Sequence, residues 1–578
     1  MISCSIDLTN QYYPWEYINY NEIKFSFKGN IFLDREILNS SRLIDLFSPL
    51  LMSNNENKLH QLIEVIASLK GEFAIVIEFQ NYIISAVDRV RSIPLFYSKT
   101  DCYFVISDDA YCIKNRLKSK IDEINAAEFL VTGYVIGQNT LCDEIKQLEA
   151  GEILIYDKAK DNIVSSAYFH FINNDSLDVD ENILLDKLDF CFLNVFNRLI
   201  ESTVNKGMQI VVPLSGGLDS RIIVAMLKRL GVTNVICFTY GNKNDTEVKI
   251  SERVAKFVGY KWVFVEYTFS EWNGILESTE ILEYQRYGCN LVSMAHIQDY
   301  LAVKMMKKKG ILTEDAVFIP GHSGDMLAGS HIPLLPVNHG SIYNFDECSK
   351  QILLKHYSLW NWKQIELIDL FKANIKKTIN PITVNDVTSY INALEIFNFK
   401  ERQSKYIVNS VRVYEYFNYS WRLPLWDPEL IDFFTKIPLK YKIAQYLYIK
   451  YASEILFSES LEELCNIECT TKLKKGKEPS RSLSAKVFVN FGLRNISKMV
   501  GTFKISRHLY RYYIKIQQNK QYIPSSCLRS KDIVDVLNNY PTLKMITIHG
   551  SEKVFSYGMN IWSLHHILHI IERENRKE

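Results

Sequence analysis

The chain has 578 residues, of which 47% are hydrophobic and 23% charged, and its formal net charge is +1. This length predicts more than one domain, and the balanced charge provides no overall attraction to nucleic acid. No basic run precedes an apolar run near the start, and no stretch of about 18 apolar residues occurs, so neither a secretory signal nor a membrane-spanning helix is expected. The 11 cysteines form no C-x-x-C pair, which indicates reduced thiols, a cytoplasmic protein of bacterial type and no zinc site.

Residues 1–172 are predicted as a β-rich domain. Short β-branched or aromatic runs separated by polar turns predict strands at residues 71–79, 81–88, 102–107 and 150–157. The acidic, polar stretch at residues 173–182 is predicted as a linker to the next domain.

From residue 183 the pattern changes to apolar strands that alternate with helices. Strands are expected at residues 208–214, 234–241, 261–267 and 316–321, and helices at residues 220–230 and 246–258. Such alternation predicts a doubly wound parallel sheet, whose ligands bind beyond the carboxyl ends of the strands. Two glycine-containing turns, at residues 213–221 and 320–325, lie at such ends.

The turn PLSGGLDSR, residues 213–221, predicts an anion site. Gly216 and Gly217 have no Cβ, so we expect positive φ angles and a close approach of the backbone to an anion. The helix that follows points free N–H groups and the positive end of its dipole at the turn. The turn contains no lysine and is therefore not a Walker loop.

Asp219 indicates what this turn holds. A carboxylate repels phosphate unless a divalent cation lies between them, so Asp219 predicts Mg²⁺ bridging the carboxylate and a phosphate. The alternative is an ordinary strand–helix turn in which the aspartate and a serine cap the helix.

The segment SGGLDS resembles the pyrophosphate loop of the N-type ATP pyrophosphatases. Residues 320–329, PGHSGDMLAG, are similar to the metal-binding segment of asparagine synthetases, and residues 422–443 to the segment that closes their site. Residues 71–98 and 129–156 resemble the amidotransferase half of the same family. Because these motifs occur in the family order over most of residues 25–475, the chain is identified as similar to the asparagine synthetase family. It is also related in pattern to β-lactam synthetase and lasso-peptide cyclases.

The resemblance implies two domains. Residues 1–172 would form a shortened, degenerate Ntn-type αββα glutaminase fold. Residues 183–480 would form an adenine-nucleotide α-hydrolase-like (PP-loop ATP pyrophosphatase) domain with a helical C-terminal part. Residues 481–578 are expected to form a basic, mainly helical extension.

The implied activity is that of an ATP-dependent, amide-forming ligase. A carboxylate would attack the α-phosphate of ATP, giving an acyl-adenylate and pyrophosphate, and ammonia or an amine would then displace AMP. The residues expected to bind ATP and its pyrophosphate are Leu214, Ser215, Gly216, Gly217, Asp219, Ser220, Thr239 and Gly321. Asp219 and Asp325 are expected to hold Mg²⁺, and those expected to take part in catalysis are Asp219, His322 and Lys472.

Two catalytic assignments keep an alternative. Lys472 best matches the family's phosphate-contacting lysine, with Lys474 and Lys475 as the next choices and a solvated basic loop as the alternative. His322 stands where the family has an acid. It would act as a general base toward an amine, or only donate a hydrogen bond beside the nucleotide.

The glutaminase nucleophile of the family is missing. Family glutaminases use an N-terminal cysteine, whereas Cys4 follows three residues here, and the bulky Ile2 disfavours removal of the first methionine. Lys28 replaces the asparagine of the oxyanion hole, although Gly29 is retained. We therefore expect no glutaminase activity and no chemical role for Cys4.

The substrate stays open among three readings. The first is an asparagine synthetase homologue that uses free ammonia or a partner's glutaminase. The second amidates a specialised carboxylate, such as a sugar acid in surface-polysaccharide assembly, and the third closes a ring with an internal amine; these two fit the missing glutaminase better. Arg286 and His296 are candidates for lining the carboxylate pocket. A non-catalytic scaffold is the alternative of another class, and the retained pair Asp219 and Asp325 speaks against it.

The expected partners are a small-molecule or peptide carboxylate, ammonia or an amine, and a separate glutaminase or carrier. Residues 481–520 contain nine Lys or Arg and no acid, with aromatic residues between them. This segment is expected to form a solvated helical face, or to rest on an anionic membrane surface or a carrier. No nucleic-acid motif accompanies it, and a homodimer stays open.

Overall fold

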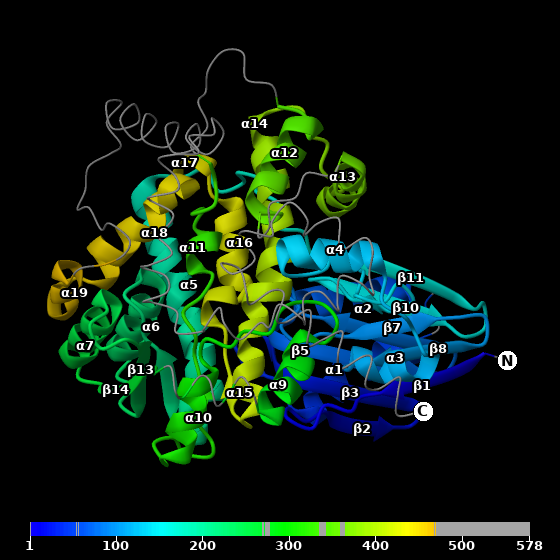
Figure 1. Ribbon diagram of the computed structural model, residues 1–578, viewed down its shortest axis with the longest axis horizontal. Coiled ribbons are helices and arrows are strands. Elements are labelled where there is room, and N and C mark those ends of the chain that lie inside the picture. Colours follow the sequence, from blue (N-terminus) through cyan, green and yellow to red (C-terminus); the bar gives the residue numbers. More distant parts are fainter. Residues whose placement is uncertain are drawn as a thin grey trace.

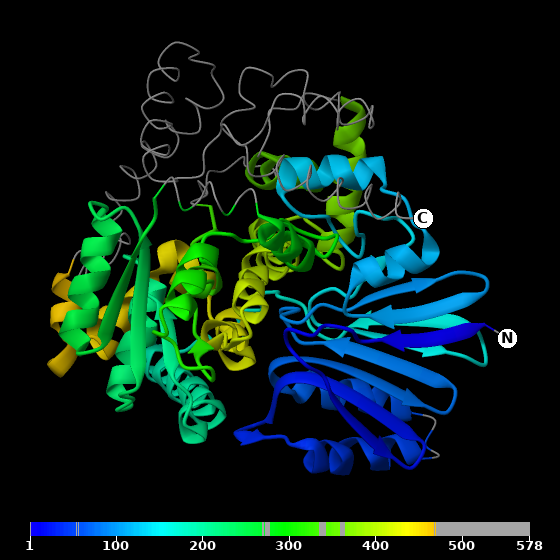
Figure 2. The same cartoon turned by 60° about the horizontal axis from the view of Figure 1, so that its bottom comes forward.

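The computed structural model describes residues 2–469 except 54, 56, 269–270, 272–274, 276–277, 334–342, 359–364 and 468. A β-sandwich and a parallel-sheet domain lie side by side, with further helices over their junction (Figures 1 and 2). No helix among the described residues has the length and apolar content to cross a membrane. Lys472, Lys474, Lys475 and the predicted extension 481–578 lie outside the described residues.

The N-terminal part consists of two stacked sheets. The smaller sheet has the order β1-β8-β7-β9 and comprises β1 (Ser3–Asp7), β8 (Tyr103–Ser107), β7 (Phe96–Lys99) and β9 (Lys146–Gln147). The larger sheet has the order β11-β10-β6-β5-β3-β2, with β4 paired to β3. Its strands are β2 (Glu16–Tyr20), β3 (Ile23–Leu33), β4 (Glu36–Ile37), β5 (Lys70–Phe79), β6 (Tyr82–Val87), β10 (Glu152–Asp157) and β11 (Asn162–Ala167).

Strand periodicity places helices on the outer faces of both sheets. On β5, Phe73 and Ile75 belong to the core under α1 (Ser40–Met52) and α2 (Lys58–Ser68). The alternate residues Ala74 and Val76 belong to the core shared with the smaller sheet, because successive strand residues point to opposite faces. Helix α3 (Ala110–Leu117) packs on β7 and β8, so the expected αββα layering is confirmed. Helix α4 (Glu123–Thr132) instead reaches the second part.

The second part is built on a five-stranded parallel sheet. Its order is β14-β13-β12-β15-β16, and its strands are β12 (Ile210–Pro213), β13 (Val235–Gly241), β14 (Lys261–Glu266), β15 (Val317–Phe318) and β16 (Ser420–Trp421). The chain runs outward from β12 through α6 (Leu218–Arg229) and α7 (Thr246–Val258), then returns to the other side of β12. The predicted doubly wound sheet is therefore confirmed, and both glycine turns meet where the strand order reverses.

Two predicted boundaries were wrong by a few residues. Helix α6 begins at Leu218, two residues before the predicted start, and Gly217 is its N-cap. Strand β15 ends at Phe318 although residues 316–321 were expected. Ile319 N still donates to Val211 O at 2.8 Å, but Pro320 has no N–H with which to continue the ladder.

Helices and short helical turns make up the rest of the second part. They are α5 (Glu181–Ser202), α9 (Thr279–Cys289), α10 (Tyr300–Lys308), α11 (Gly324–Leu327), α12 (Phe345–His356), α13 (Ile365–Ile379), α14 (Val387–Phe397), α15 (Arg412–Tyr416), α16 (Pro428–Lys436), α17 (Leu439–Lys442), α18 (Tyr446–Tyr451) and α19 (Glu463–Asn466). A π-helical segment, Asn398–Ile407, continues α14. Long π-helical stretches are rare and are found mostly at functional sites.

The predicted linker 173–182 is fixed to the second part. Asn174 N donates to Thr435 O at 2.9 Å, and Leu177 N to Lys436 O at 2.8 Å. Asn173 is buried, and its side chain donates to Ile437 O at 2.8 Å. Backbone N–H groups and the Asn173 side chain therefore attach this segment to the C-terminal end of α16. The domain limits at residues 172 and 183 stay predictions.

A buried ion pair joins the two parts. Lys405 Nζ lies 2.6 Å from Glu401 Oε2, and both side chains are fully buried. Lys405 Nζ also donates to Val135 O and Gly137 O, and Gly137 N donates to Glu401. Because every one of these groups has partners, the pair avoids the cost of an uncompensated buried charge.

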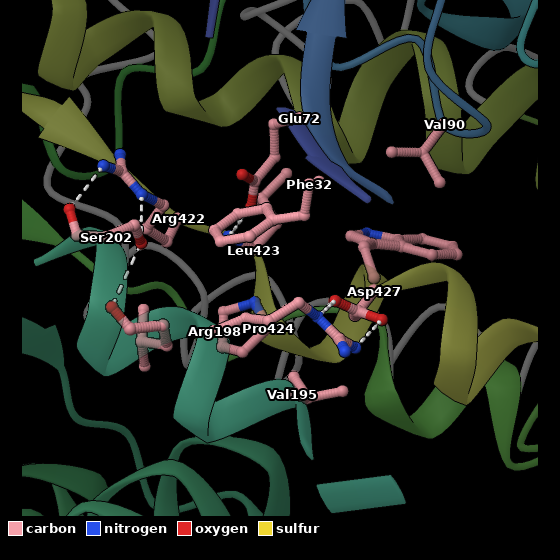
Figure 3. A pocket seen from close by; sticks show the side chains of 13 residues that line it. Phe32, Glu72, Val90, Val195, Arg198, Ser202, Arg422, Leu423, Pro424 and Asp427 are labelled. Atoms are coloured by element: carbon pink, nitrogen blue, oxygen red, sulfur yellow. Dashed lines mark hydrogen bonds and ion pairs between the residues drawn. The ribbon is translucent and has the colours of Figure 1, made fainter. Parts of the chain in front are cut away.

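A small cavity with apolar and charged lining residues lies at the same junction (Figure 3). Its volume is about 30 Å³, which is room for a single water molecule. Glu72 accepts a 2.7 Å hydrogen bond from Leu423 N, and Arg422 donates to Ser202 Oγ and Asn30 Oδ1, each at 3.1 Å. Burial, opposed by the charge of Arg422, raises the pKa of Glu72 to about 7.

This raised pKa predicts a pH-dependent effect of Glu72→Gln. The folded protein binds a proton at Glu72 more tightly than the unfolded chain, so this stabilisation is present below about pH 4.5 and is lost as the pH rises through about 7. The wild type should lose at most about 3 kcal/mol across this window, and the variant should not. Urea unfolding at about pH 5 and about pH 8 measures the difference in unfolding free energy. Equal differences at both pH values would contradict the prediction, and Glu22→Gln, at an exposed position, is the control.

Candidate active site

The SGGLDS turn is held in shape by its own serines. Ser215 N donates to Ser220 Oγ at 3.2 Å, and Gly217 N donates to Ser215 Oγ at 3.1 Å. Gly217 has φ −83°, and neither Gly216 nor Gly217 is among the glycines with positive φ. The expected left-handed backbone was therefore wrong, and what the missing Cβ provides here is room beside the turn.

The two strands beside this turn fix its base. Leu214 N donates to Phe238 O at 2.8 Å, which extends the ladder between β12 and β13. The buried Thr239 hydroxyl bonds Leu214 O and Ser251 Oγ, each at 2.6 Å. Thr239 thus ties β13 to the turn and to α7, and in this arrangement its hydroxyl is occupied by protein partners.

The second glycine turn, residues 320–325, packs directly on the first. A Cβ added at Gly321 would lie 2.6 Å from the backbone N and Cα of Ser220. A Cβ at Gly324 would lie 3.1 Å from Asp219 Cγ and 2.5 Å from Tyr448 Oη. Only glycine allows two backbones to approach as closely as they do at Gly321, so this position sets the separation of the two turns.

This approach brings the two predicted metal ligands together. Asp219 Oδ2 accepts a 3.0 Å hydrogen bond from Asp325 N, and Asp219 Oδ1 accepts a 2.9 Å bond from Tyr448. Asp325 Oδ2 accepts from Ser330 Oγ at 2.9 Å. Burial, followed by the charge of Asp325, raises the pKa of Asp219 to about 7.

These two carboxylates fit a hard divalent cation. Mg²⁺ prefers oxygen ligands and usually takes one or two protein carboxylates together with phosphates and water. Within the described ranges no group of three or more His, Cys, Asp or Glu side chains is arranged to hold a metal. Asp219 and Asp325 would therefore share the ion with nucleotide phosphates, and its charge would offset their mutual repulsion.

His322 lies beside this pair and is partly buried. Its Nε2 is 3.0 Å from Ser410 Oγ, and its buried Nδ1 atom has no hydrogen-bond partner among the described residues. Burial, with a smaller contribution from His296, lowers the pKa of His322 to about 3. A base of such low pKa is poorly matched to proton abstraction near neutral pH. This state of the protein therefore favours the hydrogen-bonding alternative for His322.

The two weaker candidates take different places. His296 Nε2 donates to Tyr406 O at 2.8 Å, and His296 contributes to the lowered pKa of His322. Arg286 instead lies 3.4 Å from Asp109 Oδ2 and 4.5 Å from the ring centre of Tyr111. Both of these partners belong to the N-terminal part, and the role of Arg286 in a carboxylate pocket stays a prediction.

Several contacts of the site carry no sequence signal. They come from Tyr448 on α18, from Ser330 after α11, and from Gln403 and Ser410 near the π-helical segment. In the closing segment 422–443, Arg422 contributes to the junction between the two parts. Leu425 of the same segment lies next to the second glycine turn, since a Cβ added at Gly324 would lie 3.0 Å from its side chain.

Arg221 connects the first turn to the end of the described chain. Its side chain is fully buried, and Nη1 donates to Leu464 O at 2.7 Å and to Ile467 O at 2.9 Å. These carbonyls close α19, a few residues before Lys472.

Comparisons with known proteins agree with this geometry. Residues 195–460 match the asparagine synthase domain family, and residues 60–169 match the glutamine amidotransferase domain family. The chain belongs to the asparagine synthetase family. Membership implies an enzyme, an ATP-using amidation ligase of the carbon–nitrogen class.

Two related sequences carry names from the asparagine synthetase family. A "Putative asparagine synthetase 1" (glutamine-hydrolyzing) of Methanocaldococcus jannaschii is 21% identical over 461 residues, covering 73% of this chain and 68% of that protein. A "Probable asparagine synthetase" (glutamine-hydrolyzing) of Acanthamoeba polyphaga mimivirus is 43% identical over 70 residues. That second match spans 11% of this chain and only 13% of the mimivirus protein.

Solved structures show weaker similarity. An NH3-dependent NAD synthetase of Campylobacter jejuni is 15% identical, with a TM-score of 0.18, over 34% of this chain and 95% of that one. The tRNA thiolase NcsA of Methanococcus maripaludis is 10% identical, with a TM-score of 0.22, over 59% of this chain and 81% of that one. Scores this low add nothing to the functional argument.

The contact between the turns predicts a strong effect of Gly321→Ala. The added methyl group would overlap the backbone of Ser220, and overpacking of this kind costs about 1–3 kcal/mol. We expect a lower melting temperature and at least a tenfold loss of Mg·ATP affinity in calorimetry. Gly231→Ala is the control, because its Cβ would meet no atom within 4 Å and only its φ of +73° disfavours alanine. Wild-type ATP affinity in Gly321→Ala would rule out this role.

Proposed function

We propose that this asparagine synthetase family member activates a carboxylate as an acyl-adenylate and transfers the acyl group to ammonia or an amine. The observation that carries the proposal is the convergence of Asp219 and Asp325 at the carboxyl ends of β12 and β15. There, Asp325 N donates to Asp219 at 3.0 Å. A phosphate turn and two carboxylates at one switch point form a site for a metal-bound nucleotide.

The first step is an attack on phosphorus. An oxygen of the substrate carboxylate would bond to the α-phosphorus of ATP while the bond between the α-phosphorus and the bridging oxygen breaks, releasing pyrophosphate. The turn from Leu214 to Ser220 would hold the leaving pyrophosphate with backbone N–H groups and the N-terminus of α6. Lys472 is proposed to add a positive charge there. Mg²⁺, when bound by Asp219 and Asp325, would offset the negative charge on the phosphates.

The second step forms the amide. The nitrogen of ammonia or an amine would attack the acyl carbon, the bond to AMP would break, and the nitrogen would lose a proton. His322 is proposed to orient the nucleophile, because its Nδ1 is buried without a partner and its ring is neutral. Amidation of a specialised carboxylate, such as a sugar acid, and ring closure by an internal amine both fit a protein without a nitrogen source of its own.

The N-terminal domain is proposed to lack glutaminase activity. Cys4 Sγ donates a hydrogen bond to the backbone oxygen of Ile2 at 3.8 Å. Lys28, at the position of the family's oxyanion-hole asparagine, is 1% exposed and lies 3.8 Å from Asp108 Oδ2. Its ammonium lies over the rings of Tyr13 and Trp15, at 5.2 and 5.6 Å from their centres. Burial lowers the pKa of Lys28 to about 8, and a buried cation fills this space.

A glutaminase assay tests the role of the N-terminal domain. The purified protein should release no ammonia from glutamine above the level of Cys4→Ala, because the thiol has no adjacent base. Ammonia release is measured in a coupled assay with and without Mg·ATP. A glutamine-dependent rate that disappears in Cys4→Ala would overturn this part of the proposal.

Asp219→Asn tests the nucleotide site. The neutral amide keeps the shape of the side chain but loses one metal-binding charge, so carboxylate-dependent pyrophosphate release should fall by about 100-fold or more. Its thermal stability should be equal or higher, because repulsion between two partly buried carboxylates is relieved. The control is Asp315→Asn, at an exposed position before β15. Pyrophosphate release at the wild-type rate in Asp219→Asn would exclude the proposed site.

A further inference from the structure

A second cavity opens within the N-terminal sandwich. Its volume is about 490 Å³, which falls in the range of small-molecule sites, about 300–1,000 Å³. Its walls come from β1, β2, β3, β5 and β6. None of the residues proposed for the nucleotide site lines this cavity, and neither does Lys28 at the position of the oxyanion hole. The cavity therefore has no place in the chemistry proposed above.

The cavity lies between the edges of the two sheets. Strand β1 is the last strand of the smaller sheet, and β2 is the last strand of the larger one. Figure 1 shows both as dark blue strands in the lower part of the sandwich. Tyr17 Oη, on β2, donates to Leu8 O, just after β1, at 3.4 Å. A side chain thus bridges the two edges, and the exposed Asn19 lines the mouth of the cavity.

The wall that β3 contributes is polar. Phe25 and Phe27 belong to the core under α1 and α2, so the alternate residues Lys24 and Ser26 face the smaller sheet. Residues between the sheets of a sandwich normally form an apolar core. Ser26, however, is 9% exposed, and its hydroxyl has no hydrogen-bond partner among the residues that the structure describes. Because an uncompensated buried hydroxyl is costly, this position is suited to a ligand that forms hydrogen bonds.

A row of polar side chains crosses three strands beside Ser26. Asn19 on β2 lies opposite Lys24 on β3, which lies opposite Glu78 on β5. Glu78 accepts from Lys24 Nζ at 3.0 Å and from Lys158 Nζ at 2.7 Å, whereas the Asn19 amide bonds no other side chain in the described part of the chain. A cationic ligand would compete with two lysines for Glu78, and an anionic ligand would lie against that carboxylate. The row therefore favours a neutral ligand with donors and acceptors.

Apolar surface completes the cavity. Ile6 and Leu8 come from β1 and its end, and Ile83 comes from β6. The side chain of Tyr17, at the mouth, is 62% exposed. A pyranose sugar has matching properties, because its C–H faces are apolar and each of its hydroxyl groups can both donate and accept.

We infer that the N-terminal sandwich binds a neutral sugar in this cavity. The sugar hydroxyls would bond the Asn19 amide, the Ser26 hydroxyl and the pair of Lys24 and Glu78, while a C–H face lies against Ile6 and Leu8. Binding is non-covalent and does not depend on the adenylation proposed above. It gives a binding function to a domain that is proposed to have lost glutaminase activity.

Two thiols of the protein report on occupancy of the cavity. Cys4 lines the cavity and is partly buried, whereas Cys102 is exposed and does not line it. Alkylation of each thiol by iodoacetamide is followed by peptide mass spectrometry. The sugar probes are D-glucose, N-acetyl-D-glucosamine and maltose, and L-alanine and phosphate are the zwitterionic and anionic comparison probes. At least one sugar should slow alkylation of Cys4 by about threefold once it exceeds about twice its dissociation constant, and leave Cys102 unchanged.

Two substitutions test the hydrogen bonds. Asn19→Ala and Ser26→Ala should each raise the sugar concentration that half-protects Cys4 by about tenfold, as the loss of one hydrogen bond predicts. Ser26→Ala should not lower the melting temperature, because the hydroxyl that it removes has no protein partner among the described residues. Asn162→Ala and Ser166→Ala are matched controls. They lie at exposed positions of β11, the opposite edge of the same sheet, and should keep full protection.

Three results would overturn the inference. The first is that none of the sugars protects Cys4, and the second is that alanine or phosphate protects it as well as the sugars do. The third is equal protection in Asn19→Ala, Ser26→Ala and the wild type. Slower alkylation of Cys102 to the same extent would also refute it, since the effect would then not come from the cavity. Pyrophosphate release does not enter this test, so failure of the proposed ligase chemistry would leave its outcome unchanged.

Discussion

The candidate site depends on the close contact between two strand-end turns. The backbone of Ser220 lies where a side chain on residue 321 would begin, 2.6 Å from the ideal Cβ position. This contact lets Asp325 N donate a hydrogen bond to the Asp219 carboxylate and so brings the two acidic residues together. A parallel sheet brings strand ends to one edge, but only glycine at position 321 lets the turns meet there.

The N-terminal sandwich contributes to this site through packing. The buried ion pair of Lys405 and Glu401 connects the backbone at Gly137, in the N-terminal part, to the π-helical segment. That same segment carries Gln403, which contacts the second glycine turn. At the cavity of Figure 3, Glu72 holds the backbone of the closing segment at Leu423. A domain proposed to have lost its own chemistry would thus still position the elements around the nucleotide site.

The acidic and hydroxyl residues of the two glycine turns could be predicted from the sequence, because their side-chain types suit a metal-bound phosphate. Asp219, Asp325 and the serines of the first turn were predicted because carboxylates and hydroxyls at strand ends serve a metal-bound phosphate in only a few ways. The predicted φ angles of Gly216 and Gly217 were wrong, since their missing Cβ atoms provide space rather than a left-handed turn. The contact of Arg286 with Asp109, 177 residues away in the chain, was not predicted. No local pattern reports such a pairing.

By itself, the sequence determined the alternation of strands and helices and the two glycine turns that carry Asp219 and Asp325, because each depends on neighbours within a few residues. Only the tertiary structure decided that Tyr448 and Ser330 hold those carboxylates and that desolvation lowers the pKa of His322. These features arise where segments far apart in the chain exclude water together. Desolvation and the pairing of charges are properties of that shared environment, so they cannot be read from any one segment.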